Sequence, residues 1–125
     1  MEIYTDFADW LDKHMEDDLP EDIVAFNFNL YEGSANTYDV ELVGCGSYDE
    51  EDDGWVCDEV FDTRDDWFVI PRTNGVAQGE QGLSFASALV ERYLREGKYA
   101  AELKNYTAVG IGLHEGDIEI LHRAE

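Results

Sequence analysis

The sequence is poor in basic residues. It contains 8 Lys and Arg against 30 Asp and Glu among 125 residues, so the net charge is −22. Nucleic acids and anionic membranes repel such a chain, and direct binding to either is therefore disfavoured. A basic protein or free cations are the partners that this charge favours.

Long apolar runs are also missing. No stretch of 18 apolar residues exists that could span a membrane. The N-terminal residues Met-Glu-Ile-Tyr-Thr-Asp-Phe lack the basic and apolar regions of a signal peptide. These two absences predict a cytoplasmic protein.

Cysteine is scarce, since Cys45 and Cys57 are the only two and lie 12 residues apart. Their spacing is neither a CxxC motif nor that of a zinc finger. They could form a disulfide, but a chain of this length can fold without one. We expect free, partly buried thiols and leave their pairing open.

Catalytic motifs are absent as well. Ser84 lies in Gly-Leu-Ser-Phe-Ala rather than in a G-x-S-x-G nucleophile elbow. The three histidines lack the spacing that would place two imidazoles on one helical face, as a zinc site requires. An EF-hand alignment that begins at Asp49 puts Val60 where the bidentate glutamate is needed. The sequence therefore predicts a protein that is not an enzyme and carries no cofactor or metal.

The acidic residues that are present concentrate in the first half. Residues 1–66 contain 22 acids and 2 bases, a net charge of −20, whereas residues 67–125 contain 8 acids and 6 bases. Like charges at this density repel one another and raise the free energy of the folded state. A positively charged partner would relieve that repulsion.

The 44% hydrophobic content of the 125 residues predicts one globular domain that spans residues 1–125. Apolar residues at three- and four-residue spacing predict a first helix over residues 6–18. A second helix is expected from Ser84 as its cap to Gly97 as a left-handed C-cap, and a short helical turn over residues 99–104.

Alternating apolar residues predict a hairpin of strands 24–30 and 38–42, with the polar side chains of the first strand on an outer face. Residues 55–61 and 67–70 are rich in aromatic and β-branched side chains and predict two further strands. Exposed loops are expected over residues 44–54 and 71–82, the second one mobile.

The chain ends in a predicted hairpin that turns at Glu115-Gly116. The expected register pairs residue 113 with 118 and 111 with 120, which places four apolar side chains on one face. The element order is then α-β-β-β-β-α-β-β. This order predicts an α+β two-layer sandwich with a mainly antiparallel sheet.

Aromatic residues are interleaved with acids between residues 48 and 67. Protein interfaces take much of their binding energy from aromatic anchors inside a polar rim, and charge steers the encounter. The competing interpretation places both tryptophans in the core and gives the acids a role in solubility alone. The candidate partner-binding residues are Tyr48, Asp49, Glu50, Glu51, Asp52, Asp53, Trp55, Asp58, Glu59, Asp62, Asp65, Asp66 and Trp67.

With its α+β order, opening amphipathic helix, acidic-aromatic segment 48–61 and C-terminal hairpin, the chain resembles the small acidic immunity proteins of bacterial polymorphic-toxin and contact-dependent growth inhibition systems. The resemblance implies a non-catalytic antidote in the cytoplasm. Such a protein binds a basic toxin domain, often a nuclease, and covers its active site. Two alternatives remain: a nucleic-acid mimic that inhibits a DNA- or RNA-binding protein, and a divalent-metal-dependent enzyme.

Overall fold

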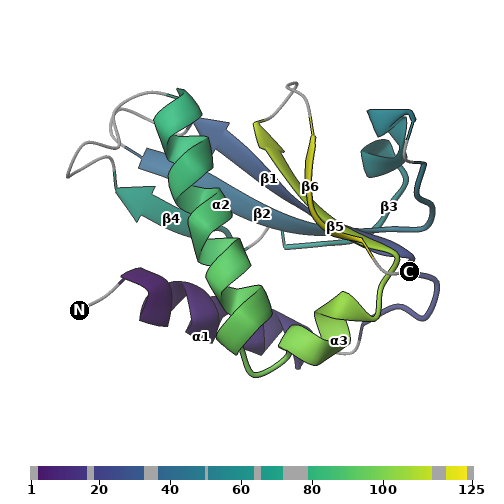
Figure 1. Cartoon of the computed structure of the whole chain (residues 1–125), viewed down its shortest axis with the longest axis horizontal. Helices are drawn as coiled ribbons and strands as arrows, with labels where there is room; N and C mark the ends of the chain where they lie inside the picture. The colour runs from purple at the N-terminus through teal and green to yellow at the C-terminus, as the bar shows by residue number, and fades with distance from the viewer. Residues whose placement is uncertain are drawn as a thin grey trace.

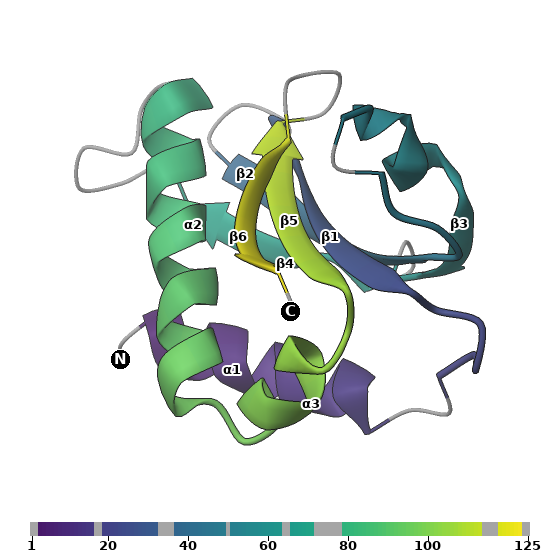
Figure 2. The same cartoon turned by 45° about the vertical axis from the view of Figure 1, so that its right-hand side comes forward.

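The computed structural model describes residues 3–16, 19–32, 37–49, 51–63, 66–71, 79–113 and 118–123. Its helices pack on one face of a six-stranded, mainly antiparallel sheet (Figures 1 and 2). The predicted α+β architecture is therefore confirmed.

Two long strands form the centre of the sheet. Strand β1 (Ala25–Glu32) pairs antiparallel with β2 (Thr37–Cys45), and Phe28 lies opposite Leu42. The alternation in both strands points apolar side chains toward the helices, as the sequence predicts. On its other side β1 pairs parallel with β5 (Ala108–Leu113), because the chain returns to the sheet by way of two helices.

Strands β3 (Glu59–Asp62) and β4 (Phe68–Pro71) share the outer edge of β2. The first pairs with the end of β2 and the second with its beginning. Between them, the Leu42 amide donates to Thr63 Oγ1 at 2.9 Å, and the Thr63 amide donates to the Leu42 carbonyl at 3.1 Å. The two strands thus form one interrupted edge.

The predicted strand over residues 55–61 is wrong in its first half. Residues 53–57 form a 3₁₀ helix, η1 (Asp53–Cys57), and β3 begins only at Glu59. Asp52 caps this helix, since its Oδ1 accepts from the Gly54 amide at 2.9 Å. The Asp-Asp-Gly sequence thus favours a capped turn where aromatic content alone predicts a strand.

Three helices cover the sheet: α1 (Ile3–Met15), α2 (Gly79–Glu96) and the short α3 (Ala100–Lys104). Phe7 of α1 lies at the centre of the core, with its ring centroid 5.4 Å from that of Phe68 and 6.0 Å from that of Phe28. Because α2 begins at Gly79, Ser84 lies inside the helix and is not its cap. The predicted loop 71–82 is accordingly too long at its end, and residues 72–78 lie outside the described part.

Gly97 follows α2, but its φ is outside the left-handed range, so the predicted C-cap is wrong. Its amide donates to the Tyr93 carbonyl at 2.7 Å and continues the helical pattern. A Cβ at this position would lie 2.6 Å from the Tyr93 ring. Glycine is therefore required here because an aromatic ring covers its Cα.

The last hairpin joins β5 to the edge strand β6 (Glu119–Arg123), and its register differs from the predicted one. Ile111 lies opposite Glu119 rather than residue 120, because a bulge interrupts the pairing between Val109 and Gly110. The bulge turns Leu121 toward the main core and leaves Ile120 38% exposed. The prediction that all four apolar side chains share one face is wrong. The turn at residues 114–117 lies outside the described residues.

Candidate functional site

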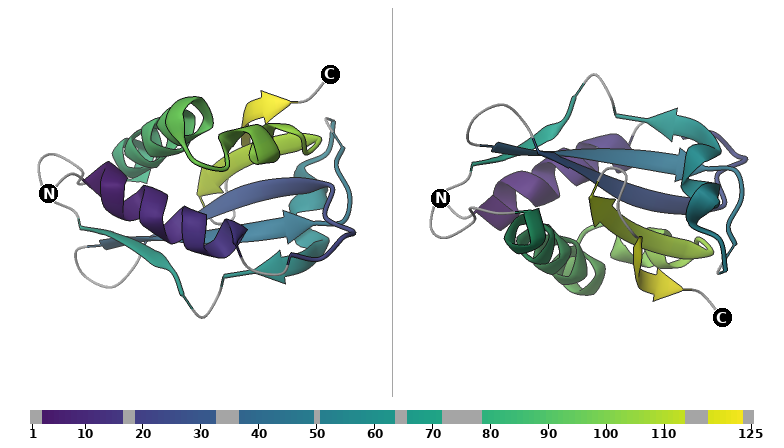
Figure 3. Two further views of the ribbon diagram at one scale, coloured as in Figure 1. Left: turned by 90° about the horizontal axis from the view of Figure 1, so that it is seen from below. Right: turned by 90° about the horizontal axis from the view of Figure 1, so that it is seen from above.

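The connection from β2 to β3 contains the densest charge in the chain. We call residues 46–62 the acidic segment; it holds eight acidic residues and no basic one. Its helix η1 lies over the face of the sheet that the three helices leave uncovered (Figure 3). Exposed acids of the segment are Asp49, Glu51, Asp52, Asp58, Glu59 and Asp62. Glu50 and the side chain of Asp53 lie outside the described part.

Trp55 fastens this segment to the sheet. The indole is only 4% exposed and packs on Ala25, Val43, Cys45 and Ala108 in a small cluster separate from the main core. Small side chains at these sheet positions leave room for a large ring. Of the two tryptophans among the predicted partner-binding residues, Trp55 does not face outward. Trp55 therefore holds the segment in place and offers a partner little surface of its own.

Both ends of the segment are fixed as well. The Gly46 amide donates to the Asp58 carbonyl at 2.9 Å, which closes the segment at its base. The thiol of Cys45 donates to the Val56 carbonyl at 3.8 Å. Cys45 is fully buried, and the side chain of Cys57 lies outside the described part. The segment is thus a folded unit rather than a loose acidic loop.

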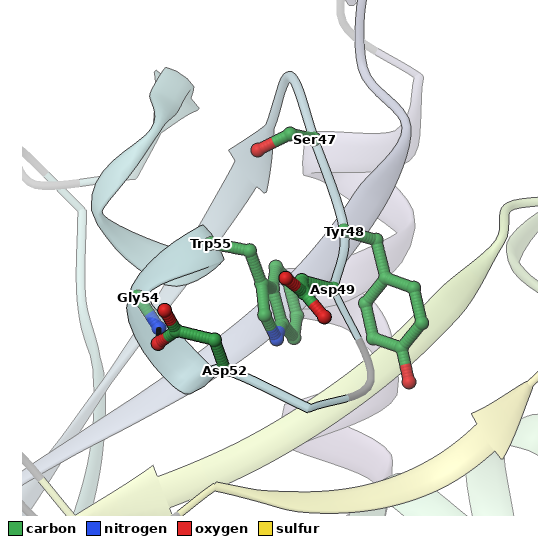
Figure 4. A pocket seen from close by; sticks show the side chains of 6 residues that line it. All are labelled: Ser47, Tyr48, Asp49, Asp52, Gly54 and Trp55. Carbon is green, nitrogen blue, oxygen red and sulfur yellow. Dashed lines mark hydrogen bonds between the residues drawn. The ribbon is translucent and has the colours of Figure 1, made fainter.

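A pocket opens inside the segment (Figure 4), with a volume of about 400 Å³. Asp49 Oδ1 accepts from the Glu51 amide at 2.9 Å, and Asp52 Oδ1 accepts from the Gly54 amide at 2.9 Å. Each carboxylate is thereby oriented through one oxygen. The lining residues are Ser47, Tyr48, Asp49, Asp52, Gly54 and Trp55.

Asp66, a predicted site residue, serves a different contact. Its carboxylate Oδ2 is bonded to Lys13 and lies 2.9 Å from His14 Nε2, and its backbone carbonyl accepts from Trp10 Nε1 at 2.7 Å. A hydrogen bond from Lys13, followed by a weaker one from His14, lowers the pKa of Asp66, although desolvation opposes the shift. Asp66 therefore ties α1 to the connection between β3 and β4.

Trp67 also lies apart from the pocket. The half-buried indole stacks on Tyr31 with ring centroids 4.9 Å apart and an interplanar angle of 13°. Its Nε1 is buried and has no hydrogen-bond partner in the described part of the chain. Asp65 lies outside the described residues. The candidate site residues thus divide between the acidic segment and the contact near α1.

Other acids of the first half lie elsewhere on the surface. Helix α1 and the residues after it also carry exposed carboxylates. Figures 1 and 2 show α1 at the opposite end of the molecule from η1. These acids are Asp6, Asp9, Glu16, Glu21 and Asp22, of which Glu16 is paired with Lys98. The charge of −20 in residues 1–66 is therefore not confined to the acidic segment, which combines its own share of the charge with a pocket.

The outer face of β1 is not the solvated surface that the alternation predicts. Asn27 is fully buried, and so is Glu41 on the neighbouring strand. Glu41 Oε1 accepts from the Tyr31 hydroxyl at 3.1 Å and from Asn29 Nδ2 at 3.3 Å, and Asn27 Nδ2 donates to Asn29 Oδ1 at 2.6 Å. A sequence pattern identifies the side chains that share this face but not the fact that the face is covered.

The chain matches no family model, no curated protein and no solved structure. Among the described residues, no group of three or more His, Cys, Asp or Glu side chains is placed to hold a metal ion. In the same part of the chain, no helix combines the length and the apolar character that crossing a membrane demands.

Proposed function

We propose that this chain is a non-catalytic binding protein whose acidic segment docks on a basic protein. The observation that supports this proposal is that residues 46–62 contain eight acids and no base, and that the buried side chain of Trp55 fixes them to the sheet. Carboxylates held on a folded unit lose less conformational entropy on binding than those of a flexible tail. Their negative potential also accelerates encounter with a cationic partner.

The narrower form of the proposal is an immunity protein that neutralises a cationic toxin domain in the cytoplasm of the producing cell. It is supported by the resemblance in element order and by the acidic-aromatic segment. A toxin that acts on nucleic acid has a basic substrate groove, and an acidic unit fits that groove by charge. The acidic segment would cover the groove and exclude the substrate.

Two matched variants test the proposal. The first neutralises four exposed acids of the segment: Asp49→Asn, Glu51→Gln, Asp52→Asn and Asp58→Asn. The second neutralises four exposed acids elsewhere: Asp6→Asn, Asp9→Asn, Glu21→Gln and Asp22→Asn. Both remove the same charge, so a difference between them reports position rather than net charge.

Each tagged variant and the unchanged chain are used to capture proteins from the producing bacterium, and the captured protein is identified and purified for affinity measurements. We expect a basic protein whose affinity falls at least tenfold with the segment variant, and by much less with the other one, because a binding charge acts most strongly at short range. A captured toxin domain supports the immunity role, whereas a DNA-repair or restriction protein supports mimicry of nucleic acid. Equal losses with both variants would contradict the proposed interface.

A further inference from the structure

The pocket of the acidic segment has an unusual lining for its size. Two aromatic rings, Tyr48 and Trp55, meet with centroids 5.1 Å apart and an interplanar angle of 70°. Two carboxylates, Asp49 and Asp52, complete the lining (Figure 4). At about 400 Å³ the pocket is near the lower end of the range for ligand sites, about 300–1,000 Å³. It has room for one side chain rather than for a folded element.

The two carboxylates are oriented so that each can still bind a cation. Each uses Oδ1 to accept a backbone amide of its own turn, and within the described residues no partner binds the second oxygen of either group. The acidic segment supplies no basic side chain of its own that could neutralise them. Two oriented acceptors next to aromatic rings form the environment in which a cation gains both charge pairing and cation–π attraction.

Trp55 adds a donor to the same site. The side chain lines the pocket although it is only 4% exposed, and its indole N–H makes no hydrogen bond within the described part of the chain. The Trp55 Nε1 atom is not among the buried atoms that lack a partner, so in the unbound chain it is open to water or to a ligand in the pocket. A ligand that carries a carbonyl oxygen beside its positive charge would satisfy this donor, and a basic amino-acid residue within a peptide has both groups.

We infer that this pocket receives one arginine side chain of the basic partner. The guanidinium binds Asp49 and Asp52 and stacks against the aromatic lining, and a carbonyl of the same peptide accepts from the Trp55 indole. This inference rests on the proposed function, because it names the group of the basic protein that the acidic segment recognises.

Arginine fits this lining better than lysine does. A guanidinium is planar and carries five donors, so it can bond two carboxylates at once while its face lies on an aromatic ring. An ammonium group is a strongly hydrated point charge and gains less from the rings. The site should therefore distinguish two ligands of equal charge, which a merely acidic surface does not.

The test uses N-acetyl-L-arginine amide and N-acetyl-L-lysine amide as probes of the whole chain, followed by the indole N–H signals in NMR spectra. The chain has three tryptophans, and Trp55→Phe assigns the relevant signal. We expect the arginine probe to shift the Trp55 signal in a saturable manner, with an affinity about threefold or more above that of lysine. Trp10 donates to Asp66 and lies outside the pocket, so its signal is an internal reference.

Two isosteric pairs provide the control. Asp49→Asn with Asp52→Asn removes both pocket charges but keeps the Oδ1 acceptors, so the turns are preserved. Glu51→Gln with Asp58→Asn removes two exposed charges of the same segment outside the pocket. We expect a loss of arginine affinity of about tenfold or more for the first pair and a smaller loss for the second. An unchanged Trp55 signal in the unbound variants shows that the segment stays folded.

Equal shifts with both probes, or equal losses with both pairs, would overturn the arginine site. The proposed function is judged separately, by capture of a basic protein. If the acidic segment captures such a protein but its pocket does not select arginine, the inference fails and the proposed function stands. If the pocket selects arginine but no basic protein depends on the segment for binding, the proposed function fails and only the preference of the pocket for arginine stands.

Discussion

Replacement of Trp55 with alanine tests whether one buried ring holds the acidic segment in its binding form. A tryptophan side chain buries about 150–250 Å², and at about 25 cal/mol per Å² this corresponds to about 4–6 kcal/mol. Measured truncations of buried aromatic residues reduce stability by about 3–5 kcal/mol. Since Trp55 is 4% exposed, we expect a loss within that second range.

The location of Trp55 determines how this loss appears. The indole packs in the small cluster on the sheet face opposite the three helices, whereas Phe7, Phe28 and Tyr93 build the main core under the helices. Typical domains have a stability of about 5–15 kcal/mol. The main core should therefore remain folded in Trp55→Ala while the acidic segment loses its fixed shape. All eight acids of the segment are retained, so the variant separates shape from charge.

Urea unfolding followed by far-ultraviolet circular dichroism measures the stability, and titration with the captured basic protein measures the affinity. We expect a stability loss of about 3–5 kcal/mol, or of at least about 2 kcal/mol where local unfolding limits it, together with a clear loss of affinity. A stability loss below about 1 kcal/mol, the size expected for a surface substitution, would refute the claim that Trp55 fixes the acidic segment to the sheet. Unchanged affinity despite lower stability would show that charge alone is sufficient.

Trp67→Ala is the matched control, since it removes a second indole that is only half-buried and stacks on Tyr31. A stability loss of about 1–2 kcal/mol is expected from the lost aromatic pair and the burial. Its affinity for the partner should stay close to that of the unchanged chain. A loss as large as that of Trp55→Ala would extend the interface to Trp67, as the sequence predicts.

Three further substitutions test the fold around the site. Asp66→Asn should reduce the stability by about 0.5–1 kcal/mol near pH 7. Because Lys13 lowers the pKa of Asp66, this stabilisation is present above the unfolded pKa of about 3.9 and is lost as the pH falls through the folded pKa. The stabilities of the two chains, measured by urea unfolding between pH 7 and pH 2, should therefore converge at low pH. Gly97→Ala should reduce the stability by about 1–3 kcal/mol because its Cβ meets the Tyr93 ring. Gly97→Asn, which a left-handed cap would tolerate, should lower the melting temperature at least as much as Gly97→Ala does. Glu41→Ala should reduce the stability by about 1–2 kcal/mol because it removes the acceptor of two half-buried donors, Tyr31 and Asn29. Glu41→Gln, which keeps an acceptor, should reduce the stability less in the same assay.

The central hairpin could be predicted because its pattern is local. Alternation in β1 and β2 identifies the side chains that face the core, and the short connection makes the two strands neighbours. The parallel pairing of β1 with β5 has no such signal, because periodicity reports a face and not a neighbour. The bulge in β6 adds one residue that composition does not reveal, and that residue is enough to shift the register of the last hairpin.

The sequence predicts the exposed acids of the candidate site but not the burial of Trp55 or the contact of Asp66 with α1. Exposure of the consecutive acids follows from the free energy needed to bury charge. The burial of Trp55 does not follow, because aromatic residues occupy cores and interfaces alike. The contact between His14 and Asp66 joins residues 52 apart in the sequence, so neither residue shows locally that Asp66 belongs with α1 rather than with the acidic segment.

Because the acids occupy more than one surface, net charge and binding site should affect different steps of association. On the proposed function, acids outside the acidic segment act on the partner through the long-range field, which accelerates encounter and is screened by salt. In the proposed complex, Asp49 and Asp52 contact the partner directly, and losing such a contact speeds dissociation. We therefore expect the variant Asp6→Asn, Asp9→Asn, Glu21→Gln, Asp22→Asn to lower the association rate of the captured basic protein by a few-fold at low salt and to leave the dissociation rate unchanged.

The pair Asp49→Asn with Asp52→Asn should show the opposite kinetic pattern. Stopped-flow association and surface-based dissociation measurements, each at two salt concentrations, separate the two rates. We expect the pair to raise the dissociation rate about tenfold or more with a smaller change in association. If the variant with substitutions at Asp6, Asp9, Glu21 and Asp22 raises the dissociation rate as much as the pocket pair does, then acids outside the acidic segment also touch the partner, and the segment is only one part of a wider interface.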